Sequence, residues 1–212
     1  MRGDACAPVR MYSRDLQPFH CSQVQGRGLS TIPMPVAAIE VATCPLAGLT
    51  QHIRDTHHAY LGRELPVLWD LLKEAASARG GHGAEDAAVR RATRLFGGFR
   101  STLENHLLKE EAVLFPFVER LERSIGIGEP VPAHAFGPLR LPIEVLEGEH
   151  MLADRFLDEL RPLWTRWRAE TGASAPQETF RERMLALEAD MSRHTYLEDH
   201  VLFPRTILLE GR

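Results

Sequence analysis

Two stretches of the sequence repeat the same combination of imidazole, carboxylate and apolar side chains. His106 begins HLLKEEAVLFP, and His194 begins HTYLEDHVLFP 88 residues later. Six of the eleven aligned positions are identical, among them the histidine, a glutamate four residues on and the final Val-Leu-Phe-Pro. Positions four residues apart share one face of a helix, so His106 pairs with Glu110 and His194 with Glu198. Both donor types bind transition-metal ions, and the pairs therefore predict a metal site.

Further histidines lie near the middle of two other predicted helices. One is His150, and the other belongs to the pair His57-His58, between which the periodicity does not decide. A single histidine on an apolar face is usually a hydrogen-bonded core residue. Histidines on four helices, two of them with a glutamate at i+4, favour metal binding, with a metal-free His/Glu hydrogen-bond network as the alternative.

The number of donors predicts two metal ions rather than one. Each ion would take two imidazoles, and the two ions would share the carboxylates of Glu110 and Glu198, with a bridging oxo or hydroxo group completing the centre. Imidazole with carboxylate suits iron; manganese and zinc are the alternatives. The three cysteines lie outside the predicted core faces, which argues against a thiolate site.

Four long helices are predicted to position these donors. Their expected spans are 45–78, 84–124, 138 to just before Gly172, and 174–209, separated by segments rich in Gly or Pro. Apolar residues recur at spacings of three and four, which predicts core-facing stripes that include the donors and also Val113 and Val201. The fold class is therefore an all-α, up-down antiparallel four-helix bundle over residues 44–212, preceded by an irregular leader at 1–43.

The prolines that end the twin motifs, Pro116 and Pro204, lie inside the predicted helices. Proline has no N–H to donate to the carbonyl four residues back. We expect each of them to kink its helix or end it.

Composition limits the classes of partner. The 212 residues are 44% hydrophobic and 25% charged, with a net charge of −4 and no basic block, so nucleic-acid binding is not expected. No apolar run approaches the ~20 residues that span a bilayer, so we expect no membrane segment. A secretory apolar region is not evident, and three scattered cysteines fit a reducing cytoplasm.

The segments HIRDTHHAYLGRELP, NHLLKEEAVLFP, GEHMLADRF and RHTYLEDHVLFPR resemble the hemerythrin-like domain of the repair-of-iron-centres family. The similarity spans roughly residues 45–207. It implies a di-iron centre in which four histidines are terminal ligands and two glutamates bridge the irons. In that family the first-helix histidine lies eight residues before a Leu-Pro proline, here Pro66, which selects His58 over His57. The ligands carried over are His58, His106, His150, His194, Glu110 and Glu198.

The resemblance implies a protein of the nitrosative and oxidative stress response. It would bind or reduce nitric oxide, or supply iron to damaged iron–sulfur proteins; whether it turns over a substrate as an enzyme is left open. The alternative is a dioxygen or redox sensor or carrier. Oxygen-carrying hemerythrins have a further histidine where this chain has Asp154, which makes carriage the weaker reading. We expect Glu111 to be exposed, and Glu149 either to support the centre or to lie on a solvated face.

Overall fold

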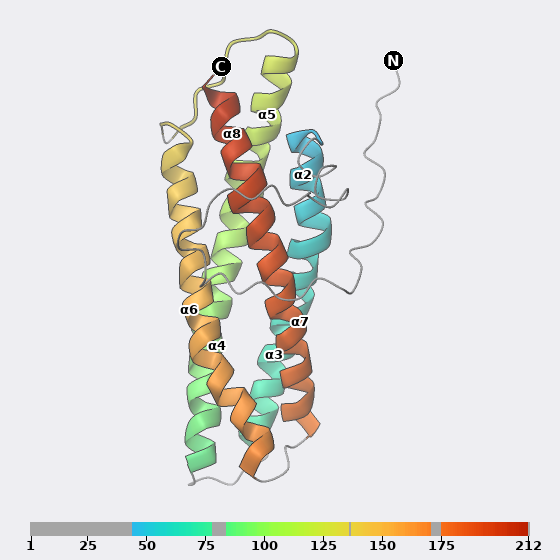
Figure 1. The fold of residues 1–212 in the computed structure, drawn as a ribbon, viewed down its shortest axis with the longest axis vertical. Helices are drawn as coiled ribbons and strands as arrows, with labels where there is room; N and C mark the ends of the chain where they lie inside the picture. The colour runs from blue at the N-terminus through green and yellow to red at the C-terminus, as the bar shows by residue number, and fades with distance from the viewer. Residues whose placement is uncertain (1–43, 78–83, 136, 171–174, 212) are drawn as a thin grey trace, which may run out of the picture.

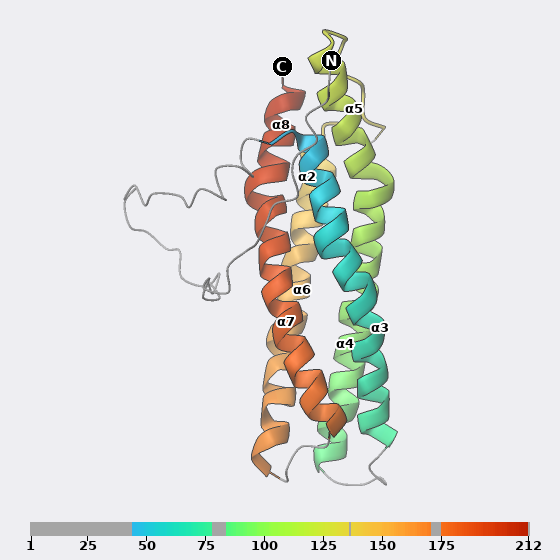
Figure 2. The same ribbon diagram turned by 90° about the vertical axis from the view of Figure 1, so that its right-hand side faces the viewer.

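The computed structural model describes residues 44–77, 84–135, 137–170 and 175–211. Within them, the helical elements form four long helices. Two views at right angles show them side by side along the longest axis of the molecule (Figures 1 and 2). This is the predicted all-α, up-down antiparallel bundle. The predicted leader at 1–43 and the turn at Gly80-Gly81 lie outside the described residues.

Three of the four helices consist of two α-helical parts joined by a π-helical turn. Helix 1 contains α2 (Leu46–Ile53), η1 (Arg54–His58) and α3 (Ala59–Ser77). Helix 3 is the uninterrupted α6 (Arg140–Glu170). Helix 2 contains α4 (Ala84–Lys109), η2 (Glu110–Leu114) and α5 (Phe115–Gly126), and helix 4 contains α7 (Ala175–Leu197), η3 (Glu198–Leu202) and α8 (Phe203–Glu210).

The N-terminal ends of helices 1 and 3 are capped by carboxylates from the ends of their neighbours. The Glu122 carboxylate accepts the Leu46 and Ala47 N–H groups at 2.7 and 2.9 Å. The Glu210 carboxylate accepts the Leu139 N–H at 3.1 Å. These contacts satisfy N–H groups that have no partner within the helix. Glu122 and Glu210 are again 88 residues apart, so the internal repeat extends beyond the twin motifs.

The π-helical turns explain how the chain passes Pro116 and Pro204. In each case the residue before the proline donates its N–H five residues back, Phe115 to the Glu110 carbonyl and Phe203 to the Glu198 carbonyl. Of the two expected outcomes, a kink or an end of the helix, the second was wrong, because helix 2 continues to Gly126 and helix 4 to Glu210. Each proline lies in the first turn of the next α-helical part, where its missing donor is tolerated.

The same turns correct the predicted core beyond the twin glutamates. A π-helical turn holds one extra residue, so every later side chain is rotated relative to an α-helical pattern. Val113 is 41% exposed and Leu114 is buried instead, although the α-helical spacing predicted Val113 in the core. In helix 4, Val201 is only half-buried while Leu202 is fully buried.

Two apolar clusters fill the bundle, one on either side of the predicted metal ligands. One is built around Leu61, Phe96 and Leu187, and the other around Ile53, Leu121 and Phe203. The predicted donors form a polar layer between these clusters, so apolar side chains separate them from both ends of the bundle. No helix among the described residues is long and apolar enough to cross a membrane.

The first cluster should dominate the stability of its half of the bundle. Phe96 is fully buried, and its ring lies 5.8 Å from that of Phe99 and 5.9 Å from that of Phe180. We expect Phe96→Ala to lower the free energy of unfolding by about 3–5 kcal/mol, because it leaves a cavity. Chemical denaturation measures this. Leu108→Ala, on the exposed side of the same helix, is the control and should change it by less than about 0.5 kcal/mol. Equal effects would contradict the assigned core.

Candidate metal centre

Four helices bring the six predicted donors into one layer. His58 ends η1, Glu110 and Glu198 begin η2 and η3, His106 and His194 lie one turn earlier in helices 2 and 4, and His150 comes from α6. All six are buried, and both glutamates are fully so. Each π-helical turn in the described chain thus contains one predicted ligand, as is common for such turns at functional sites.

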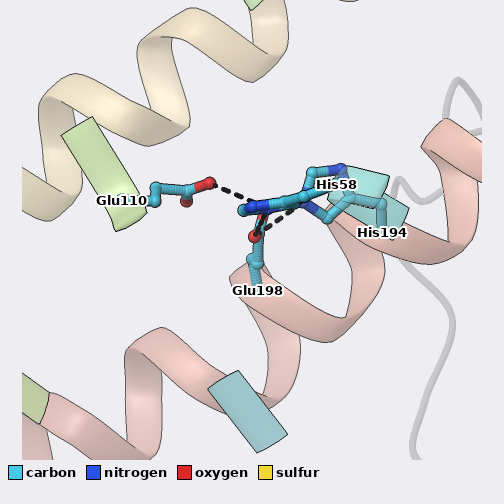
Figure 3. A group of neighbouring side chains, drawn as sticks. All are labelled: His58, Glu110, His194 and Glu198. Atoms are coloured by element: carbon cyan, nitrogen blue, oxygen red, sulfur yellow. Dashed lines mark hydrogen bonds and ion pairs between the residues drawn. The ribbon is translucent and has the colours of Figure 1, made fainter. Parts of the chain in front are cut away.

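The donors divide into two groups that share both glutamates. One group is His58, Glu110, His194 and Glu198, which Figure 3 shows with the two carboxylates reaching the imidazoles from different helices. The other is His106, Glu110, His150 and Glu198. In each group one donor atom per residue lies within 4.8 Å of all the others.

The shared carboxylates contact both groups. Glu198 Oε1 lies 2.7 Å from His194 Nε2, and Glu198 Oε2 lies 3.1 Å from His150 Nε2. Glu110 Oε2 lies 3.4 Å from His58 Nε2 and 3.3 Å from His106 Nε2. Each carboxylate therefore lies between the two histidine pairs, as a bridging ligand would.

His57 lies outside both groups, although it too is buried. Its Nδ1 lies 3.0 Å from Asp190 Oδ1, and its ring stacks on that of His194 with centroids 5.4 Å apart. The structure thus places His58, not His57, among the gathered donors. Asp154 is exposed and belongs to neither group, so its position supplies no additional donor to the layer.

Carboxylates outside the layer contact the other nitrogen of three imidazoles. Glu111 Oε1 lies 2.8 Å from His58 Nδ1, Asp199 Oδ1 lies 2.9 Å from His150 Nδ1, and Glu149 Oε2 lies 3.1 Å from His106 Nδ1. Such contacts favour an N–H at Nδ1 and leave the Nε2 lone pair free for a ligand role. Glu149 takes the supporting position that the sequence offered as one possibility.

Helical spacing alone did not predict the supporting role of Glu111 and Asp199. Glu111 is exposed as predicted, and its carboxylate still reaches His58. The available signal was the repeat itself, because both twin motifs place an acidic residue directly after the shared glutamate.

Burial and neighbouring charges shift the pKa values of the imidazoles in opposite directions. Burial lowers the pKa of His106 to about 4, and repulsion from His150 adds to the effect. Burial likewise lowers the pKa of His194. For His58, burial acts in the same direction, but the carboxylates of Glu110 and Glu198 outweigh it and raise the pKa to about 10.

The other groups of the layer follow the same physics. Burial would lower the pKa of His150, but Asp199 and Glu198 raise it to about 10. Burial and the Glu198 charge raise the pKa of Glu110 to about 8. Burial acts to raise the pKa of Glu198 too, yet His194, His150 and His58 hold it well below its usual range. The opposite shifts of the two glutamate pKa values favour a layer in which Glu198 is ionised and Glu110 is not. The neighbouring imidazoles stabilise the charge on Glu198.

The donor geometry fits metal ions. Two imidazole nitrogens that bind one metal ion at about 2.0–2.1 Å, with a right angle between the two metal–nitrogen bonds, lie about 3.0 Å apart. The Nε2 atoms of His58 and His194 are 3.1 Å apart, and those of His106 and His150 are 3.0 Å apart. In the second pair His150, whose pKa is raised, donates its Nε2–H to the Nε2 lone pair of His106, whose pKa is lowered. A metal ion between the two nitrogens would take the place of that proton.

Known proteins are similar in sequence to most of this chain. The family model for the hemerythrin HHE cation-binding domain matches residues 50–206. The iron-sulfur cluster repair protein YtfE of Edwardsiella ictaluri (strain 93-146) is 29% identical over 163 residues, which cover 77% of this chain and 66% of the relative. The protein of the same name from Escherichia coli O157:H7 is 27% identical over 165 residues, covering 78% and 68%. The chain spans about two thirds of the length of these relatives.

The Glu110 carboxylate should destabilise the metal-free protein. It is fully buried, and neither oxygen accepts a hydrogen bond of good geometry among the described residues; Oε2 meets the His58 and His106 imidazoles only at 3.4 and 3.3 Å. An unsatisfied buried polar group costs about 1–3 kcal/mol. We therefore expect Glu110→Leu to raise the free energy of unfolding of the chelator-treated protein by about 1 kcal/mol or more, as measured by denaturation. Glu104→Leu, on the surface of the same helix, is the control with little change expected. A lower free energy of unfolding in Glu110→Leu would contradict a destabilising effect of the buried carboxylate.

Proposed function

The chain belongs to the hemerythrin HHE cation-binding family, and we propose that it is a non-haem di-iron protein that supplies iron for the repair of iron–sulfur clusters. One observation carries the proposal: four buried imidazoles and two buried carboxylates form two donor groups that share both carboxylates. The relatives named for iron–sulfur cluster repair support the direction of the function. Nitric oxide and dioxygen are the small ligands proposed for the same centre.

The proposed ligands are His58 and His194 for one iron and His106 and His150 for the other, with Glu110 and Glu198 bridging. Two imidazoles and two shared carboxylates give each iron four protein donors. When bound, the irons would supply open coordination positions at which nitric oxide or dioxygen binds. Nitric oxide reductase activity is the turnover proposed for such a centre.

The chain's own residues would hold and protect the centre. The carboxylates of Glu111, Glu149 and Asp199 orient three of the imidazoles through Nδ1. Phe115 stacks on His58 and Phe203 on His150, with ring centroids 5.5 and 6.1 Å apart. These aromatic rings exclude water from one side of each histidine pair.

The second candidate is a dioxygen or redox sensor or carrier without turnover. It needs the same centre but no iron release. The exposed position of Asp154, where oxygen carriers have a histidine, leaves only the four gathered imidazoles as nitrogen donors in the described chain. We therefore rank iron supply above carriage.

Metal content tests the centre itself. Elemental analysis of protein from iron-supplemented medium should give about two irons per chain, as two donor groups require. Glu198→Ala removes a donor from both groups and should lose most of the bound iron. Glu178→Ala, exposed near the start of helix 4, is the matched control and should retain it. Full retention of iron by Glu198→Ala would rule out the bridging role, and a metal-free, folded native chain would leave a His/Glu hydrogen-bond network.

Iron transfer tests the function. The iron-loaded protein, mixed anaerobically with an apo-ferredoxin and a sulfide source, should rebuild the cluster, which is followed by its visible absorbance. Protein that has been stripped of iron is the control and should give no cluster. If no iron is transferred and the reduced protein neither binds nor consumes nitric oxide, the proposal fails. A reversible spectrum with dioxygen would then favour the sensor or carrier.

A further inference from the structure

The two halves of the chain can be compared position by position through the internal repeat. Helices 2 and 4 match at an offset of 88 residues, which relates His106 to His194. Helices 1 and 3 match through His58 and His150, each of which stacks on the phenylalanine of a twin motif. A difference between matched positions therefore shows where the two donor groups differ.

The donor group of His106 and His150 is supported on both imidazoles. His150 Nδ1 faces Asp199, and His106 Nδ1 faces Glu149, which also forms an ion pair with Lys109. Each ring of this pair therefore has an acidic acceptor that fixes its orientation.

The donor group of His58 and His194 is supported on one imidazole only. His58 Nδ1 faces Glu111, the repeat counterpart of Asp199. His194 Nδ1 is buried and has no hydrogen-bond partner among the described residues. Of the four gathered imidazoles, His194 is the one whose Nδ1 meets no carboxylate among the described residues.

The repeat shows which residue stands in the missing place. Glu149 directly precedes His150 in helix 3, and His57 directly precedes His58 in helix 1. Where Glu149 supplies an acceptor to His106, His57 presents the face of its ring to His194, with an interplanar angle of 8°. Asp190 holds His57 there, and the repeat counterpart of Asp190 is Thr102.

This difference should make the two metal positions unequal. A carboxylate at Nδ1 orients the ring and raises the basicity of Nε2, and its removal typically lowers metal affinity by about 10–100-fold. We propose that the His58/His194 position holds the transferable iron and the His106/His150 position holds a retained iron. The inference rests on the proposed function and assigns the iron that is supplied for repair to one of the two positions.

Iron release to a chelator tests the inference. Iron-loaded native protein is mixed anaerobically with a ferrous chelator, and the coloured complex is followed with time. We expect two phases of about one iron per chain each, with rates that differ by about 10–100-fold. A single phase that releases both irons would overturn the inference and leave iron supply intact. A chain that binds no iron at all would overturn the proposed function instead.

Variants assign each phase to a position. The double variant His57→Glu with Asp190→Thr copies the arrangement of Glu149 and Thr102 onto helices 1 and 4. It should slow the fast phase about 10-fold or more and leave the slow phase unchanged. Asp190→Thr alone and His57→Phe, which keeps a ring against His194, are the controls and should leave the fast phase fast. Equal slowing in His57→Phe would show that packing, and not the carboxylate, sets the rate.

Glu149→Gln is an independent test in a partly exposed side chain. It weakens the acceptor at His106 and should accelerate the slow phase toward the fast one. An unchanged slow phase with Glu149→Gln would overturn the inference even if the double variant does not fold.

Discussion

Buried polar groups destabilise a fold unless each of them has a partner, and this constraint governs the middle of the bundle. The chain places four imidazoles and two carboxylates between two apolar clusters, and the Glu110 oxygens accept no hydrogen bond of good geometry among the described residues. The arrangement is costly as a core and well suited to cations, whose binding energy offsets the burial. The surrounding structure can be understood as support for this layer.

The internal repeat provides that support twice. Each twin motif supplies an imidazole, a shared carboxylate, a supporting acid and an aromatic ring. The ring stacks on a histidine of another helix, Phe115 on His58 and Phe203 on His150. The π-helical turns adjust the register, so that the shared glutamate and the apolar residues after it both face inward. A local irregularity in the helix is therefore what allows metal donors and core packing to share one face.

The repeat is broken where His57 replaces an acid. With His57 stacked on His194, and Glu149 bonded to His106, the two donor groups have the same ligand types and different support. Such inequality suits the proposed supply of iron, because one position would release its ion while the other keeps the layer satisfied. The asymmetry lies in the neighbours of the ligands and not in the ligands themselves.

The sequence by itself determined the fold class, the four helices to within a few residues and five of the six donors that gather, while the family resemblance selected His58 as the sixth. Hydrophobic periodicity and the twin His-x-x-x-Glu pairs are local properties, which spacing along a helix expresses directly. Only the tertiary structure decided the rest. The burial of Leu114 in place of Val113, the stacking of His57 on His194 and the support from Glu111 and Asp199 depend on π-helical register and on contacts across helices. Spacing within one helix cannot report which side chain of a neighbouring helix stands opposite, so the unequal support of the two donor groups is a property of the packed bundle.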